Sequence, residues 1–183
     1  FMRNTREQIL DLAIHYIRKY GYDSFSYADI SKELGITKAS IHYYFKSKED
    51  LLVDIIERFI DLQRKIEVKL SEICDNKEKL KYFFIYDDEG SKEGEKCPIV
   101  MIENIMYKMN ENVKNKFHEL VVMELNNLAN IIEEYYREKK KKDFNSRKEA
   151  IRLLSMYKGN ATYSRILNDI SPMDFILEYI EKI

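Results

Sequence analysis

The chain has 183 residues, of which 45% are hydrophobic and 34% charged, a balance typical of a soluble and well-packed protein. Its formal net charge of −1 excludes a protein that coats nucleic acid over its whole surface, so any DNA contact must come from a local patch. No apolar run approaches the roughly 20 residues that span a bilayer, and no signal-peptide core is present, so we expect no membrane partner. The only cysteines, Cys74 and Cys97, are not needed as a staple, which indicates a reducing, cytoplasmic compartment.

The apolar residues recur every three or four positions and do not alternate, which predicts an all-α protein of about nine helices. A first helix is expected over residues 5–20, because Asn4 can cap its start and Gly21 suits its end. A short second helix begins after Ser26 and is ended by Gly35, and a third begins almost at once after Thr37. Two short helices joined by a glycine-containing turn form the helix-turn-helix pattern.

Longer helices are expected after this N-terminal head. Ser47 and Asp50 open a helix that runs to about residue 73. Further helices are predicted over residues 77–86, 98–109, 111–140 and 146–168, and from Pro172 onward. The acidic stretch 87–96 is predicted to be an exposed loop, and the lysine run 139–142 a solvated helix end.

The stretch from Ser26 to Leu52 reads SYADISKELGITKASIHYYFKSKEDLL and resembles the DNA-binding head of the TetR family of bacterial and archaeal regulators. The resemblance covers about residues 5–56, whereas the body matches only in helix count and length. It implies a transcriptional regulator, a ligand-responsive repressor that binds a palindromic operator in double-stranded DNA as a homodimer. The residues that carry it are Ser26, Ala28, Ile30, Gly35, Ile36, Ile41, Tyr43, Phe45, Ser47, Lys48, Glu49, Leu51 and Leu52.

The same segment has the charge that DNA requires. From Ile36 to Lys48 it contains three lysines and no acid. Ile41 and Phe45, four positions apart, are predicted to face inward, so that the start of the third helix is presented to base edges in the major groove. The residues expected at the DNA are Ser26, Tyr27, Thr37, Lys38, Ala39, Ser40, His42, Tyr43 and Lys48.

Within this set, Thr37, Lys38 and Ser40 can donate to bases or phosphates, and Ala39 leaves room for close approach or packs on a thymine methyl. The others are assigned mainly to phosphates. The family more often has glycine where Ala39 stands and a phosphate-contacting tyrosine where His42 stands. Plainer roles stay open: helix caps for Ser26, Thr37 and Ser47, plain surface for Lys46, and packing beneath the head for Tyr43 and Tyr44.

We therefore divide the chain into an N-terminal helix-turn-helix DNA-binding domain, residues 1–46, and a C-terminal helical domain, residues 47–183, for dimerisation and ligand binding. The last two helices carry more apolar surface than their inner faces need, and the resemblance implies the same two helices as a four-helix dimer interface. The interface candidates are Leu153, Leu154, Tyr157, Ala161, Ile166, Phe175, Ile176, Tyr179, Ile180 and Ile183.

The middle of the chain is rich in Phe, Tyr and Met, a lining that suits a small apolar or aromatic effector. Such a stripe is also typical of a plain packing core, and both interpretations stay open. The pocket candidates are Phe59, Tyr82, Phe83, Tyr86, Met101, Met106, Tyr107, Phe117, Met123 and Tyr157.

Two other classes of protein are alternatives to a DNA-binding regulator. An enzyme is disfavoured because His15, His42 and His118 are isolated and no glycine-rich phosphate loop is present, and we expect no cofactor and no metal. A helix-turn-helix protein that acts through protein partners without an inducer is the remaining alternative. Steep salt dependence of binding would indicate DNA, because phosphate contacts release counterions.

Overall fold

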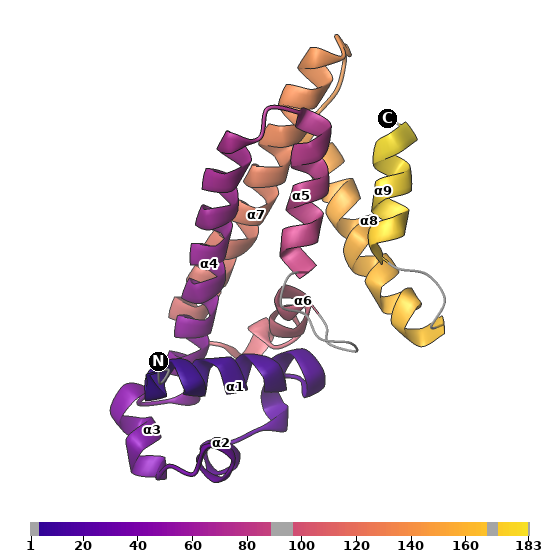
Figure 1. Ribbon diagram of the computed structural model, residues 1–183. Coiled ribbons are helices and arrows are strands. Elements are labelled where there is room, and N and C mark those ends of the chain that lie inside the picture. Colours follow the sequence, from indigo (N-terminus) through magenta and orange to yellow (C-terminus); the bar gives the residue numbers. More distant parts are fainter. Residues whose placement is uncertain (1–3, 89–96, 168–171, 183) are drawn as a thin grey trace. The chain divides into compact units, whose positions relative to one another are not determined.

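The computed structural model describes residues 4–88, 97–167 and 172–182, and Figure 1 shows its helices. Those residues form nine α-helices, two short 3-10 helices and no strand, which confirms the all-α prediction. None of the described helices is long and apolar enough to cross a membrane. The elements are α1 (Thr5–Tyr20), η1 (Tyr22–Ser24), α2 (Tyr27–Leu34), α3 (Lys38–Tyr44), α4 (Lys48–Glu72), α5 (Asn76–Asp88), α6 (Pro98–Glu103), η2 (Met106–Lys108), α7 (Glu111–Glu138), α8 (Ser146–Leu167) and α9 (Pro172–Lys182).

The chain packs as two compact units. Unit 1 comprises residues 1–59 and 92–120, and unit 2 comprises residues 60–91 and 121–183. Helices α4 and α7 each begin in unit 1 and continue into unit 2. This division by packing does not follow the boundary at residue 46, which was drawn from the motif and stays a prediction about function.

Unit 1 is built around α1. The side chain of Asn4 accepts a hydrogen bond from the Arg6 N–H and caps the helix, and Gly21 ends it at a φ of 94°, a conformation that favours glycine. Ile9, Ala13 and Ile17 are fully buried along one stripe of α1. Helices α2, α3 and α6 all contact α1, so a segment about 80 residues downstream completes the unit that holds the head.

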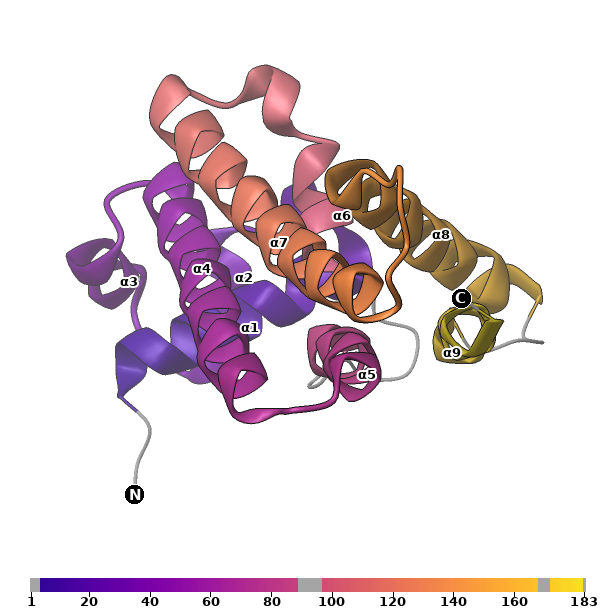
Figure 2. The same cartoon turned by 90° about the horizontal axis from the view of Figure 1, so that it is seen from above.

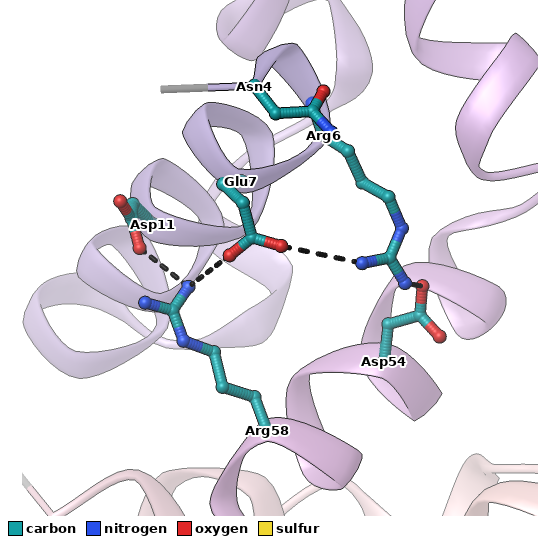
Figure 3. A network of polar contacts seen from close by, with 6 residues as sticks. All are labelled: Asn4, Arg6, Glu7, Asp11, Asp54 and Arg58. Atoms are coloured by element: carbon teal, nitrogen blue, oxygen red, sulfur yellow. Dashed lines mark hydrogen bonds and ion pairs between the residues drawn. The ribbon is translucent and has the colours of Figure 1, made fainter. Parts of the chain in front are cut away.

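A network of ion pairs joins the start of α1 to α4 within unit 1 (Figure 3). Arg6 lies 2.6 Å from Asp54 and 3.5 Å from Glu7, while Arg58 lies 2.6 Å from Asp11 and 3.6 Å from the same Glu7. The side chains are 30% to 44% exposed, so each pair contributes no more than about 1 kcal/mol. Together they orient α4 on the head.

Unit 2 has its own core, formed by apolar residues of α4, α5, α7, α8 and α9. Helix α9 contacts both α8 and α5. Figure 2 shows α9 beside α8. Two polar pairs lie in the interior of this unit. The buried Asn127 amide donates to the buried Gln63. The ammonium of the half-buried Lys158 lies 2.6 and 2.7 Å from the two carboxylate oxygens of the buried Glu124, and removing Lys158 would leave that carboxylate without its cation.

Three helix ends differ from the prediction by two residues or more. Helix α7 ends at Glu138, two residues before the predicted end at residue 140. Helix α6 stops at Glu103 and does not reach residue 109, because the Asn104 amide donates to the Val100 carbonyl oxygen at 2.9 Å. The backbone then continues with three-residue hydrogen bonds, such as Met109 N–H to Met106 O. Helix α5 extends to Asp88, so the predicted loop loses its first two residues to the helix; residues 89–96 lie outside the described part.

Candidate nucleic-acid interface

The start of α2 is fixed by a capping box. The Ser26 hydroxyl accepts from the Ala28 N–H, and both the N–H and the hydroxyl of Ser26 donate to the Asp29 carboxylate, at 2.8 and 2.7 Å. These hydrogen bonds hold the pKa of the Asp29 carboxyl below its usual value. The open role of Ser26 as a helix cap is therefore present in the structure, and its DNA contact stays a prediction.

The turn between α2 and α3 is held by Ser31. Gly35 ends α2 in the left-handed conformation, at a φ of 64°, which a side chain would strain. The Ile36 N–H then donates to the Ser31 carbonyl oxygen, and the Ser31 hydroxyl donates to the Ile36 carbonyl oxygen at 2.5 Å. Ser31 thus binds the turn from both directions and sets the angle at which α3 leaves it.

Helix α3 presents its first residues to solvent. The Thr37 hydroxyl oxygen accepts from the Ser40 N–H at 3.0 Å and caps the helix. Thr37, Lys38 and Ala39 are exposed, and Ser40 is half-buried. The first turn has no acidic residue, so the unpaired N–H groups and Lys38 give this end of the helix a positive potential.

The two faces of α3 are separated as predicted. Ile41 and Phe45 are buried at 0% and 1% exposure, whereas His42 is exposed and Tyr43 is 75% exposed. The Tyr44 ring, 37% exposed, meets the Tyr43 ring edge-on at 5.0 Å. Tyr43 is therefore a surface side chain, as DNA contact requires, and the packing role is taken by Ile41 and Phe45.

The Tyr27 hydroxyl donates a hydrogen bond within the head. It donates to the Ser47 carbonyl oxygen at 2.5 Å, and its ring meets the His42 ring edge-on at 5.0 Å. Burial of the half-buried phenol raises its pKa, with Asp50 adding to the effect. A phosphate contact by this side chain would have to displace an existing bond, so the structure supports a positioning role for Tyr27.

Lys48 is placed differently from a free phosphate ligand. Its ammonium donates to the carbonyl oxygens of Tyr22 and Phe25, both at 2.5 Å, and lies over both rings at 4.4 and 4.0 Å. Burial lowers the pKa of this half-buried amine. Two of its three N–H groups are thus engaged, and Lys48 ties the start of α4 to η1; the exposed lysines of the head's basic segment are Lys38 and Lys46.

Three acidic residues of the head and of the start of α4 contact residues 108–116 of unit 1. Asp23 lies 2.5 Å from the Lys108 ammonium, Glu57 lies 2.5 Å from Lys116, and Glu49 accepts from the Asn110 amide. These contacts reduce the negative field beside the basic segment of residues 36–48.

The segment 9–55 matches the family model described as bacterial regulatory proteins of the tetR family. The matched segment covers most of α1, the helix-turn-helix and the start of α4. The head of this chain is therefore of the TetR family. Within the matched segment, α3 is the helix whose first turn is exposed and free of acidic residues.

The similarity to known regulators extends beyond the head. The fatty acid metabolism regulator protein of Bacillus subtilis is 27% identical over 128 residues, which is 69% of this chain and 66% of the relative, just under two thirds of its length. A TetR transcriptional regulator from Legionella pneumophila has a TM-score of 0.85 at 25% identity, covering 99% of this chain and 97% of that one. FadR from Bacillus subtilis in complex with stearoyl-CoA has a TM-score of 0.70 at 21% identity, covering 95% and 96%, and shows the shared fold.

The predicted effector residues have unequal environments. Tyr107 is 82% exposed, so it is not an enclosed lining residue, while Phe83 and Tyr157 belong to the core of unit 2. The side chain of Tyr86 lies outside the described part. The other candidates are buried or half-buried: Phe59, Tyr82, Met101, Met106, Phe117 and Met123. Their contact with an effector stays a prediction.

The predicted dimer residues divide into two groups. The side chains of Leu153, Leu154, Tyr157, Ile176 and Ile180 are buried in the core of their own unit. Ile166 is 73% and Phe175 is 44% exposed, Ala161 and Tyr179 are half-buried, and Ile183 lies outside the described residues. The periodicity of the sequence marks the apolar residues on both the inward and the outward faces of α8 and α9. Ile151, Tyr163 and Leu167 of α8 are exposed as well, and the pairing of such residues between subunits stays a prediction.

Three features of the TetR head carry no local sequence signal. These are the tie from Lys48 to η1, the hydrogen bond from Tyr27 to Ser47, and the packing of α6 against α1. Each joins residues 20 or more positions apart, so only the folded chain reveals it. Within the described residues, no group of three metal-binding side chains is present.

Proposed function

We propose that this chain is a transcriptional regulator that binds a palindromic operator in double-stranded DNA as a homodimer. The observation that carries the proposal is the first turn of α3, which is exposed, free of acids and anchored by Ile41 and Phe45. In this reading Lys38, Ala39 and Ser40 face base edges, and Thr37, His42 and Tyr43 contact phosphates or bases. Ser26, Tyr27 and Lys48 act mainly by holding the head in shape.

A dimer follows from the reach of one head, which covers only a few base pairs. Two heads about one helical turn apart, roughly 34 to 36 Å, would read the two halves of a palindrome. The exposed apolar residues of α8 and α9, such as Ile166 and Phe175, support the pairing of these helices between subunits.

The protein is further proposed to be a repressor that releases DNA when an apolar effector binds its body. The names of the relatives, a fatty acid metabolism regulator and FadR with stearoyl-CoA, make acyl-CoA thioesters the first class to try. An effector must bind the DNA-free geometry better than the DNA-bound one; a coupling of about 1 to 3 kcal/mol would weaken operator binding roughly 5- to 150-fold. The known relatives are regulators, and we propose no enzymatic activity and a cytoplasmic location.

The test is footprinting and fluorescence anisotropy on the DNA that flanks the protein's own gene. We expect a protected palindrome and a steep fall of affinity with salt. Tyr43→Ala and Lys38→Ala should weaken binding by about 1 to 3 kcal/mol each if they contact DNA. Lys142→Ala, in the exposed run after α7, is the matched control and should leave binding unchanged.

The absence of a protected DNA site would contradict the proposal. If the folded dimer protects no site at low or high salt, and extraction yields no bound small molecule, the chain is not a DNA reader. The alternative, a head that binds another protein, is supported instead by an interaction that persists as salt rises.

A further inference from the structure

An open groove with a volume of about 390 Å³ lies on unit 2. Five of its lining residues come from the second half of α4, namely Arg64, Lys65, Val68, Lys69 and Glu72, and Tyr82 comes from α5. The volume is within the range of small-molecule sites, about 300 to 1,000 Å³. The groove belongs to unit 2 alone and includes no residue of the DNA-binding head.

The lining of the groove is basic on a chain whose overall charge is near neutral. It holds three cations and one acid, a local net charge of three minus one, or +2. Arg64 pairs with Asp61 at 2.6 Å and Lys69 with Glu72 at 2.6 Å, while Lys65 carries no ion pair within the described residues. Both pairs are solvent-exposed, and exposed pairs contribute little, so a ligand anion could take over these cations at small cost.

The groove also has an apolar surface beside its cations. Val68 is 63% exposed although it stands between Lys65 and Lys69 on the same helix. Tyr82 lines the same groove from α5 and is half-buried. A phenol, an isopropyl group and two ammonium groups therefore line one groove.

We propose that this groove binds an amphipathic organic anion, meaning a carboxylate or phosphate monoester attached to an apolar group. The anionic head would lie against Lys65, Lys69 and the Arg64 guanidinium, whose planar fork suits carboxylate and phosphate oxygens. The apolar group would cover Val68 and the Tyr82 ring and remove them from water. The site is independent of the proposed DNA binding, and its test contains no DNA.

The chain has no tryptophan, which allows a local reporter. In a Tyr82→Trp variant the single indole would stand in the groove, and octyl phosphate is the probe. We expect a saturable shift of tryptophan emission with octyl phosphate, and no such shift with inorganic phosphate or with 1-octanol at the same concentrations. Calorimetry on the unaltered chain should give the same affinity, which checks that the indole has not created the site.

Two substitutions and one control then locate the contacts. Lys65→Gln combined with Lys69→Gln should weaken octyl phosphate binding about tenfold or more, and Val68→Asp should weaken it further by repulsion. Lys114→Gln removes a lysine that pairs with Glu111 at the same i,i+3 spacing as Lys69 with Glu72, and it should leave the affinity unchanged. Circular dichroism and melting temperature establish that each variant is folded.

The proposal is overturned if octyl phosphate gives no shift, or if 1-octanol or inorganic phosphate gives an equal one. It is equally overturned if the double lysine variant, still folded, binds octyl phosphate as tightly as Lys114→Gln. None of these outcomes bears on operator binding, so the two proposals fail separately.

Discussion

The hydroxyl of Tyr27 and the carbonyl oxygen of Ser47 are 2.5 Å apart, and this hydrogen bond joins the first residue of α2 to the residue before α4. Helix α3 lies between these two positions in the chain. At its other end, Ser31 binds the turn at Ile36. Helix α3, which is seven residues long, is thus held at both ends by side chains that donate to backbone carbonyl oxygens.

Replacing Tyr27 with phenylalanine removes one hydrogen-bond donor and keeps the ring against His42. We expect the free energy of unfolding to fall by about 1 kcal/mol. Operator affinity should also fall, with an unchanged dependence on salt, because the lost contact is internal. Tyr20→Phe, an exposed tyrosine of α1, is the control for both measurements. A shallower salt dependence in Tyr27→Phe would instead place the hydroxyl on a phosphate.

Lys48 and Lys46 are two residues apart and should respond differently to loss of charge. Lys48→Met keeps the stem but removes the bonds to Tyr22 and Phe25, and should lower the free energy of unfolding by about 1 to 2 kcal/mol. Its salt slope for operator binding should stay as in the unaltered chain. Lys46→Ala should leave stability unchanged and, if Lys46 meets a phosphate, lower the slope by about 0.9. Exchange of these two slopes would assign the phosphate to Lys48.

The capping box at α2 makes the head sensitive to acid. Hydrogen bonds from Ser26 depress the pKa of Asp29 in the folded protein, so its carboxylate contributes stability above the unfolded pKa, and this contribution is lost as pH falls through the folded pKa. Asp29→Ala should melt at a lower temperature than the unaltered chain near neutral pH. The gap should narrow as the pH falls from the usual pKa of an aspartate through the lower pKa of Asp29 in the folded protein. Melting curves across this range decide the matter, and a gap that stays constant with pH would show that the charge plays no part.

The outer face of α8 should control assembly. Ile166→Asp places a charge on a side chain that is 73% exposed, so the monomer should fold normally while the dimer dissociates. Ile176→Asp, at a fully buried position of α9, should instead unfold unit 2. Sedimentation or light scattering reports the mass, and circular dichroism reports the fold. A folded Ile166→Asp dimer of unchanged affinity would move the interface away from this face.

The sequence predicted best what local chemistry determines. Helix α1, for example, begins and ends where Asn4 and Gly21 indicate, and the inward residues of α3 follow from the spacing of Ile41 and Phe45. The role of a side chain is predicted less well where its hydrogen-bond partners lie far away in the sequence. Lys48 has the charge of a DNA ligand, but the carbonyl groups that bind it belong to Tyr22 and Phe25, more than 20 residues away.

Periodicity has a further limit in the body. It marks apolar residues without saying which of two faces is inward, so Leu153 and Ile166 were grouped together although one is fully buried and the other exposed. The end of α6 was missed for another reason. A single side-chain bond, from Asn104 to Val100, outweighs an apolar pattern that continues beyond it.

The composition of unit 1 has a consequence for synthesis of the chain. The motif that reads DNA is finished by residue 52, but α6 and the partners of Asp23, Glu49 and Glu57 lie between residues 98 and 116. During synthesis, more than twice the length of the motif must therefore leave the ribosome before the head can form all its contacts. An exchange of heads between relatives faces the same condition, because a graft that ends at residue 59 leaves behind the segment on which α1 rests.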